Sequence, residues 1–298
     1  MTRFAAWVRP EYFFNPGQLW RRLRRERLLL DDEVRLAWGL PITIDPTVLI
    51  GFDILNLGTY DRIVPETLCR LLDAGEQAVD AGANIGLTTS ILALAAGEQG
   101  SVSAFEPHPR LGATLRANVE RWRRKGVAPI HVFAVALSNS DGRGVLREPV
   151  GFAENDGGAT LIVAAIDAGS YEVDLARLDT LFPSGSRIGV LKLDVEDYEA
   201  EVLQGAERLL GERAIRDVIF EDLGRGRSDA APLLESHGYT IYALHAAWSG
   251  PTLTAQRDWQ RSPVPPDFTH NYLATLDPAR AEQRLRRRGW RSLRLRPR

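Results

Sequence analysis

Short apolar runs alternate with amphipathic segments along the middle of the chain. The runs at residues 77–80, 102–105 and 188–193 are shorter than a core helix and predict buried strands. After the second run, the spacing of one helix face recurs in Leu111, Leu115, Val119 and Trp122. Strands that alternate with helices in this way predict an α/β fold built on a mostly parallel sheet.

The same pattern extends toward both ends of the chain. Further strands are predicted at residues 130–137, 218–220, 240–244 and 269–275, and further helices at 65–72, 196–210 and 230–237. Residues 42–50 predict short edge strands, because Pro46 interrupts their alternation. Residues 51–60 are expected to form a loop over the site, and residues 145–165 a hairpin inserted after the third strand.

Composition narrows the class of protein without naming a function. The 298 residues are 44% hydrophobic and 26% charged, and the formal net charge is −2, which gives no overall positive field for nucleic acid. Cys69 is the single cysteine, which excludes an internal disulfide and suits a reducing compartment. No run approaches the roughly 20 apolar residues of a membrane span. We therefore expect a cytoplasmic protein with no membrane span.

The stretch at residues 77–88 is the first to suggest a ligand. A strand ends at Asp80, and a turn containing Gly82, Asn84 and Gly86 leads into a helical pattern. Glycines at such a turn let the backbone bend sharply and let the helix start lie close to the strand. A strand, a tight turn and a helix N-terminus together form a common binding site for a nucleotide in α/β proteins.

Glu106 ends the next strand and indicates which part of a nucleotide binds there. It follows the glycine turn by about 20 residues, the position from which an acidic side chain accepts hydrogen bonds from a ribose. A base lying across the sheet edge would then meet Ala136, Leu137 and Ser138 at the end of the third strand. These residues predict a ligand that contains a riboside.

The glycine pattern favours one of two riboside cofactors. A dinucleotide site reads G-x-G-x-x-G and holds a pyrophosphate, whereas this turn reads D-x-G-x-N-x-G. The carboxylate of Asp80 is unfavourable beside a pyrophosphate, but it suits a cofactor that carries positive charge. We therefore expect S-adenosylmethionine, with its sulfonium and amino groups, rather than NAD.

The strand at residues 188–193 carries a second polar constellation. Alternation places Lys192 and Asp194 on one face, and a lysine inside an apolar strand needs a charged partner. Asp194 emerges at the carboxyl end of the strand, where open α/β sheets bind their ligands. Glu196 and Asp197 follow at the start of a helix, where acids are also explained by the helix dipole. Glu221 and Asp222 end the next strand.

Together these motifs resemble the FkbM family of S-adenosylmethionine-dependent methyltransferases. The motifs are Val-Asp-Ala-Gly-Ala-Asn-Ile-Gly at 79–86, Ala-Phe-Glu-Pro at 104–107, Ala-Leu-Ser-Asn at 136–139, Leu-Lys-Leu-Asp-Val-Glu at 191–196, Val-Leu-Gln-Gly-Ala at 202–206 and Phe-Glu at 220–221. The resemblance implies a Rossmann-like class I methyltransferase fold: a mostly parallel sheet of seven strands, the last antiparallel, with helices on both faces. The family usually has glycine where this chain has Asp197.

The resemblance also divides the chain. Residues 55–276 are expected to form the methyltransferase domain. Residues 1–54 are interpreted as an N-terminal helical and β extension, and residues 277–298 as a basic C-terminal tail that is solvated or disordered.

Methyl transfer to a hydroxyl requires removal of a proton, and several side chains are candidates for that work. We expect catalytic roles for Lys192, Asp194, Glu196 and Glu221. Oxygen ligands among Asp194, Glu221 and Asp222 are an alternative set for Mg²⁺. His245 and His270 are alternative bases. For all of these residues, a structural role is the competing explanation.

The acceptor is expected to be a small molecule or a saccharide with a free hydroxyl. The segments 48–60, 145–170 and 246–268 should shape its pocket, but none carries a motif that identifies it. An RNA methyltransferase that uses the basic ends, and a non-catalytic cofactor-binding or scaffold protein, are the alternatives. The oligomeric state stays open, with a homodimer as one arrangement.

Overall fold

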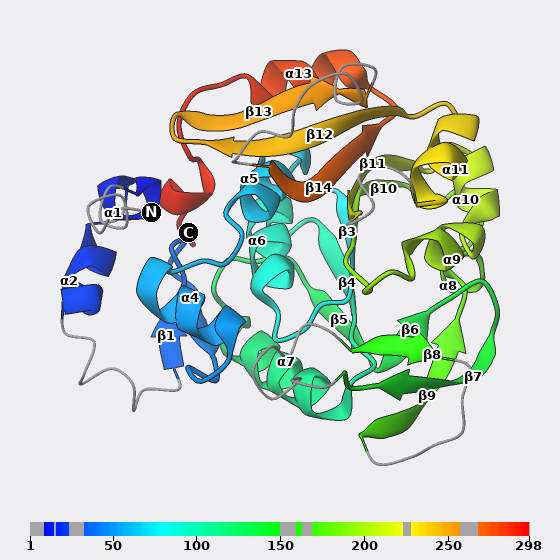
Figure 1. The fold of residues 1–298 in the computed structure, drawn as a ribbon, viewed down its shortest axis with the longest axis horizontal. Helices are drawn as coiled ribbons and strands as arrows, with labels where there is room; N and C mark the ends of the chain where they lie inside the picture. The colour runs from blue at the N-terminus through cyan, green and yellow to red at the C-terminus, as the bar shows by residue number, and fades with distance from the viewer. Residues whose placement is uncertain are drawn as a thin grey trace.

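A central sheet of eight strands organises the computed structural model (Figure 1). The structure describes residues 9–14, 16–23, 33–149, 159–162, 169–222, 228–256 and 268–297. The strands of the sheet are β3 Gln77–Ala81, β4 Ser101–Phe105, β5 Ile130–Phe133, β10 Ile188–Leu193, β11 Ile215–Glu221, β12 Thr240–Ala247, β13 Gly250–Ala255 and β14 Phe268–Thr275.

The strand order confirms the Rossmann-like class I methyltransferase fold. Across the sheet the order is β13-β12-β14-β11-β10-β3-β4-β5, and the five strands from β11 to β5 are parallel. Strand β14, the last in the chain, runs antiparallel to both of its neighbours, as expected. The eighth strand, β13, was not expected; it extends the sheet as a hairpin with β12.

Alternation along the strands places successive side chains on opposite faces of the sheet, in two apolar layers. Ala78 and Val190 belong to one buried cluster, whereas Val79 and Leu191 belong to the other. The first cluster contains buried residues of α4 Leu49–Leu57, α5 Ile63–Leu71, α6 Leu87–Ala96 and α7 Pro109–Trp122. The second contains those of α8 Leu178–Leu181, α9 Glu199–Gln204, α10 Glu207–Gly211 and α11 Ala230–Ser236. Helices therefore cover both faces of the sheet (Figure 1).

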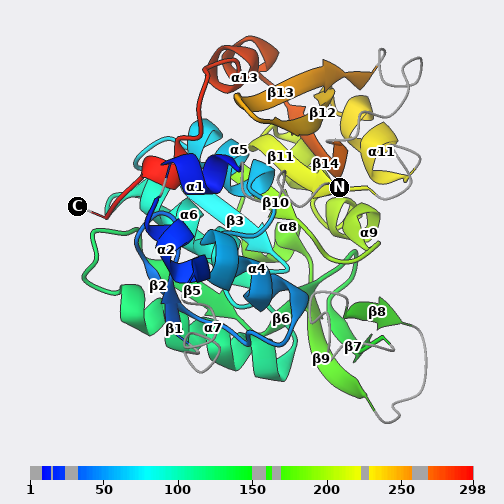
Figure 2. The ribbon, with the colours of Figure 1, turned by 60° about the vertical axis from the view of Figure 1, so that its left-hand side comes forward.

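A smaller sheet stands beside the carboxyl ends of β4 and β5 (Figure 2). Its strands are β6 Val135–Leu137, β9 Ser170–Ala176, β7 Gly142–Arg147 and β8 Thr160–Ile162, in that order. The single strand expected at 130–137 is thus divided, because residues 135–137 pair with β9 rather than with β4. Strands β7 and β8 pair antiparallel, as the inserted hairpin requires.

The N-terminal part departs from its predictions at two places. Of residues 42–50, predicted to form short edge strands, only 42–43 lie in a strand, and Leu49 and Ile50 begin helix α4. Residues 51–57 of the expected loop 51–60 form the rest of α4, which ends at Gly58 with a left-handed φ of 76°. Ile54 and Leu55 of this helix are buried in the first apolar cluster, and this burial stabilises the helix. Before it lie α1 Pro10–Phe14, α2 Gly17–Leu23 and the antiparallel pair β1 Glu33–Arg35 and β2 Pro41–Thr43.

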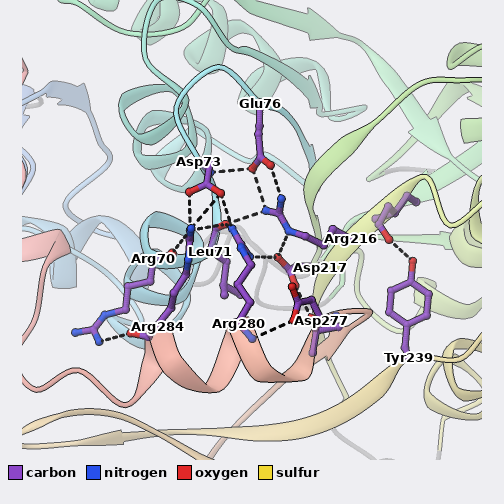
Figure 3. Close-up of polar contacts among 12 residues, drawn as sticks. Arg70, Leu71, Asp73, Glu76, Arg216, Asp217, Tyr239, Asp277, Arg280 and Arg284 are labelled. Atoms are coloured by element: carbon purple, nitrogen blue, oxygen red, sulfur yellow. Dashed lines mark hydrogen bonds and ion pairs between the residues drawn. The ribbon is translucent and has the colours of Figure 1, made fainter.

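The C-terminal segment is folded, so the expectation of a solvated or disordered tail is wrong. It forms α13 Pro278–Leu285 and the short helix η1 Ser292–Arg294. Arg280 and Arg284 both bind the carboxylate of Asp73, at 2.9 and 2.6 Å, and Arg280 also binds Asp217 (Figure 3). Trp290 is only 1% exposed. Asp73 lies 207 and 211 positions from Arg280 and Arg284, and Asp217 lies 63 positions from Arg280, so local charge could not reveal these partners.

The division of the chain at residues 54 and 277 stays a prediction. Within the described ranges, every helix is too short or too polar to traverse a lipid bilayer.

Trp290→Ala is expected to destabilise the protein by about 3–5 kcal/mol, because it leaves a cavity under the C-terminal segment. The matched control is Trp248→Ala, since Trp248 is 51% exposed; this change should cost less than about 1 kcal/mol. Urea unfolding measures both. A Trp290→Ala midpoint equal to that of wild type would show that the segment is not part of the core.

Candidate active site

A cavity of about 360 Å³ opens at the edge of the sheet where the parallel strands end. Each of five adjacent strands contributes a residue at or just beyond this edge. In spatial order from β14 to β4, these residues are Asn271, Glu221, Asp194, Gly82 and Glu106. Strand β14 contributes from its beginning because it runs in the opposite direction. This is the edge at which open α/β sheets bind ligands.

The glycine turn lies at the middle of the cavity, and two of its positions require glycine. Gly82 has a φ of +72°, and a Cβ there would lie 1.8 Å from the carbonyl oxygen of Asp194. Gly86 has a φ of +100°, and a Cβ there would lie 2.7 Å from Leu115 and 2.8 Å from Trp122. The turn therefore lies close to β10 on one side and to α7 on the other. Gly86 itself does not line the cavity.

Glu106 is fixed at one end of the cavity by two backbone donors. Its carboxylate accepts the N–H of Asn84 at 2.7 Å and the N–H of His108 at 2.8 Å. Burial raises its pKa to about 7, and these two hydrogen bonds oppose the shift. Ala136 and Leu137 of β6 line the same cavity. The structure therefore brings together Glu106, Ala136 and Leu137, three of the four residues expected to contact a riboside; the fourth, Ser138, does not line the cavity.

Asp80 lies below the turn rather than in the cavity lining. It is fully buried, and it accepts hydrogen bonds from the hydroxyls of Thr88 and Thr89, the closest at 2.6 Å. It also pairs with the ammonium of Lys192 at 3.4 Å. Asp80 therefore does not face the cavity, and its direct contact with a cationic ligand stays a prediction. Its charge acts on Lys192.

Lys192 joins the ends of β3 and β10. Its Nζ donates to the carbonyl oxygen of Gly82 at 2.8 Å and lies 3.3 Å from the carboxylate of Asp194. The prediction that Lys192 and Asp194 share a face is confirmed. Burial lowers the pKa of Lys192, but the charges of Asp194 and Asp80 outweigh it and raise the pKa above its usual value. Lys192 therefore stays protonated and is no candidate for a general base.

Two other carboxyl groups in the lining lack such partners. Among the described residues, none donates a hydrogen bond to the side chain of Glu196 or of Glu221. Burial, followed by the charge of Asp194, raises the pKa of Glu221 to about 8 and that of Glu196 to about 7. Groups that titrate near neutral pH and face a cavity are suited to accept a proton.

Sequence reasoning missed one wall of the cavity. Tyr60 and Asp61, between α4 and α5, line it together with Asn271 of β14. Asn271 lies in the strand predicted at 269–275, and Tyr60 falls in a segment expected to shape the pocket, but the sequence singled out none of the three as a site residue. The inserted segment contributes Leu146, Ala159 and Leu161. No described residue of 246–268 lines the cavity, and residues 257–267 lie outside the described part.

The remaining candidates lie away from the cavity lining. Asp222 accepts a hydrogen bond from the hydroxyl of Ser228 at 2.8 Å. His245 bonds to Thr254 at 3.1 Å, and His270 does not line the cavity either. Across the described ranges, no three His, Cys, Asp or Glu side chains are grouped to hold a metal ion. Asp194, Glu221 and Asp222 are therefore not grouped as a three-carboxylate metal site, and magnesium binding stays a prediction.

Asp197, at the position where the resemblance implies glycine, has a backbone conformation that favours glycine. Its φ is +64°, and that of Glu196 before it is +54°, so two consecutive residues adopt the left-handed conformation. Aspartate is among the residues that tolerate it best after glycine. The hydroxyl of Thr160 donates to the carbonyl oxygen of Glu196 at 2.8 Å. The inserted sheet thus helps to fix this loop.

Comparison with known proteins identifies relatives over the same region. A family model described as the methyltransferase FkbM domain matches residues 80–241. The chain is 32% identical over 205 residues to the 31-O-demethyl-FK506 methyltransferase FkbM of Streptomyces tacrolimicus, covering 58% of this chain and 75% of that protein. It is 27% identical over 199 residues to Methyltransferase 1 of Beauveria bassiana, covering 59% and 76%.

Other matches are partial or distant. The chain is 27% identical over 205 residues to the AMB antimetabolite synthetase AmbE of Pseudomonas aeruginosa, a match that covers 55% of this chain but only 9% of that protein. Among solved structures, an S-adenosylmethionine-dependent O-methyltransferase from Thermotoga maritima is 13% identical with a TM-score of 0.40, covering 82% of this chain and 76% of that one.

Glu221→Gln is expected to stabilise the ligand-free protein at alkaline pH. Burial raises the pKa of Glu221 from 4.5 to about 8, so between these values the folded state keeps a proton that the unfolded chain releases. The stability that this proton confers is complete below the lower value and is lost as the pH rises through the upper one. Glutamine does not ionise, so the variant does not lose this stability as the pH rises.

Urea midpoints of wild type and Glu221→Gln at about pH 5 and about pH 9 measure the effect, since the variant should gain on wild type only at the higher pH. Glu235→Gln is the control, because Glu235 is exposed. If the urea midpoints of Glu221→Gln and wild type differ by the same amount at both pH values, the raised pKa of Glu221 is contradicted.

Proposed function

The chain belongs to the FkbM family of S-adenosylmethionine-dependent methyltransferases, and from that premise we propose that it methylates a hydroxyl oxygen of a sugar or another natural product. The observation that carries the proposal is the pair of carboxyl groups, Glu196 and Glu221, that line the cavity and accept no hydrogen bond from the described part of the chain. An alcohol must lose its proton when its oxygen is methylated, and a carboxylate in reach can accept it. The relative from Streptomyces is named for methylation at an oxygen.

The lining residues follow, strand by strand, the same order as the parts of the cofactor that they would contact. Glu106, with Ala136 and Leu137, would hold the riboside, because a fixed carboxylate accepts hydrogen bonds from the ribose hydroxyls. The glycine turn and Asp194 lie between this end and Glu221, so they would meet the charged amino acid portion. The half-exposed carboxylate of Asp194 favours a cation beside it.

The residues of the chain then have separate tasks in the reaction. Bound S-adenosylmethionine supplies an activated methyl group, whose C–S bond breaks as the C–O bond to the acceptor forms. Glu221 accepts the proton of the acceptor hydroxyl. Lys192 keeps the ends of β3 and β10 in register, so that both halves of the cavity hold their positions. Much of the rate is expected from positioning, because the methyl group is already reactive.

A positively charged cofactor would also favour the ionised form of Glu221, the proposed base. The pKa of Glu221 is raised to about 8 by burial and by neighbouring carboxylates. A sulfonium nearby opposes this shift and favours the ionised form. Glu221 would therefore be ionised at neutral pH once the cofactor is bound. The alternative, an RNA acceptor, relies on basic residues near the ends of the chain to bind RNA. Two of these residues, Arg280 and Arg284, already form ion pairs with Asp73.

Calorimetry with S-adenosylmethionine tests the cofactor half of the proposal. Wild type should bind it, and Glu106→Ala should weaken binding about 10- to 100-fold, as expected for the loss of hydrogen bonds to a charged group. Asp174→Asn is the control, because the side chain of Asp174 forms an exposed pair with Arg143 and does not line the cavity. Unchanged affinity in Glu106→Ala would remove Glu106 from the cofactor site.

Product formation on a panel of hydroxylated sugars and natural products, followed by mass spectrometry, tests the catalytic half. Glu221→Gln should lower kcat by about 10²- to 10⁴-fold, because the proton acceptor is lost, and should weaken cofactor binding far less. Glu196→Gln is the matched variant, and a larger loss there would assign the base to Glu196. Full activity in both variants would refute a carboxylate base.

A further inference from the structure

Asp61 and Asn271 form a pair in the cavity that the steps above do not use. The side-chain amide of Asn271 donates to the carboxylate of Asp61 at 2.7 Å and to the carbonyl oxygen of Thr269 at 2.9 Å. Asn271 is also the direct partner of Glu221 in the antiparallel register of β11 and β14. Directly opposed residues lie about 4.5–5.5 Å apart at their Cα atoms and project to the same face of the sheet. Asn271 therefore holds the carboxylate of Asp61 next to Glu221.

Asp61 is held in place, but its capacity to accept hydrogen bonds is not exhausted. It stands just before α5 with a φ of +34°, and it also accepts a hydrogen bond from the backbone of Ile63. A carboxylate has about four lone-pair sites, so two donors leave room for a ligand. Because Asp61 lines the cavity, that capacity is open to whatever binds beside Glu221.

The charge of the lining limits what can bind there. Its described carboxyl groups belong to Asp61, Glu106, Asp194, Glu196 and Glu221. Its one described cation, Lys192, is already bound to Asp80, Asp194 and two backbone carbonyls. A phosphate or carboxylate on the acceptor would meet repulsion with no free cation among these residues to offset it. The site suits neutral or cationic groups that donate hydrogen bonds.

We propose that Asp61 is an acceptor-binding residue that accepts a hydrogen bond from a second donor, adjacent to the hydroxyl that is methylated. The acceptor is then a diol or an amino alcohol, not an isolated alcohol and not an anionic one. Glu221 takes the proton of the reacting hydroxyl, and Asp61 holds its neighbour. This inference rests on the proposed function, since it assigns the acceptor end of the same cavity.

The test uses the full chain saturated with S-adenosylhomocysteine and small probes. Trans-1,2-cyclohexanediol, trans-2-aminocyclohexanol, cyclohexanol and trans-2-hydroxycyclohexanecarboxylate are titrated, and their dissociation constants are followed by NMR. The diol and the amino alcohol should bind wild type about tenfold more tightly than cyclohexanol does, as one added hydrogen bond to a charged group predicts. The carboxylate should bind more weakly than cyclohexanol.

Asp61→Asn should abolish the preference for the diol over cyclohexanol, and Asn271→Ala should reduce it, because Asp61 loses its anchor. Asp174→Asn, a surface change, should keep the full preference. Calorimetry with S-adenosylhomocysteine reports folding of each variant and tests the proposed function separately. If wild type binds no S-adenosylhomocysteine, the proposed function fails.

If that ligand binds but wild type shows no preference for the diol, the acceptor assignment is wrong. The same follows if Asp61→Asn retains the preference or if the carboxylate probe binds most tightly.

Discussion

The buried ammonium of Lys192 is the constraint on which the site depends. It is 3% exposed, and it bridges the carboxylates of Asp80 and Asp194 and the carbonyl oxygens of Ala81 and Gly82. A buried charge that loses one partner costs about 3–5 kcal/mol, so the two strand ends are held together strongly. The absence of a Cβ at Gly82 lets the turn approach Asp194 within this arrangement. The cofactor turn and the acidic end of β10 are therefore one structural unit.

The described carboxyl groups around this unit outnumber its cations, and this imbalance suits a family that uses a positively charged methyl donor. Each of Glu106, Glu196 and Glu221 has a pKa raised by burial to about 7 or 8. Carboxyl groups in this state accept protons near neutral pH, and a bound cation strengthens their ionisation. Under the proposed function, a positively charged methyl donor would therefore favour the ionised form of the carboxyl group proposed as the base.

The inserted sheet contributes to the site from outside the central fold. His108 bonds Glu148 of the insertion at 2.9 Å, and Tyr171 donates to the same carboxylate at 3.0 Å. His108 also donates its backbone N–H to Glu106, so the insertion is tied to the residue expected to hold the ribose. At the other end, Thr160 binds the backbone of Glu196. The insertion thus connects the end of the cavity at Glu106 with the end at Glu196.

The sequence by itself determined the parts that depend on neighbouring positions. Apolar runs identified the central strands, the glycine turn identified the cofactor edge, and alternation along β10 placed Lys192 beside Asp194. It could not foresee that Asp80 is enclosed by Thr88 and Thr89, or that helix α4 replaces a loop. Only the tertiary structure decided these points, because they depend on what packs against each residue.

The same reason explains why the sequence did not reveal the partners of Asp61 and of the C-terminal arginines. The partner of Asp61 is 210 positions away, and that of Arg280 is 207 positions away. Periodicity and turn chemistry act over a few residues and set the local elements. Ion pairs and buried hydrogen bonds between distant segments form only once the sheet has brought those segments together, so the acceptor end of the site was decided by the fold.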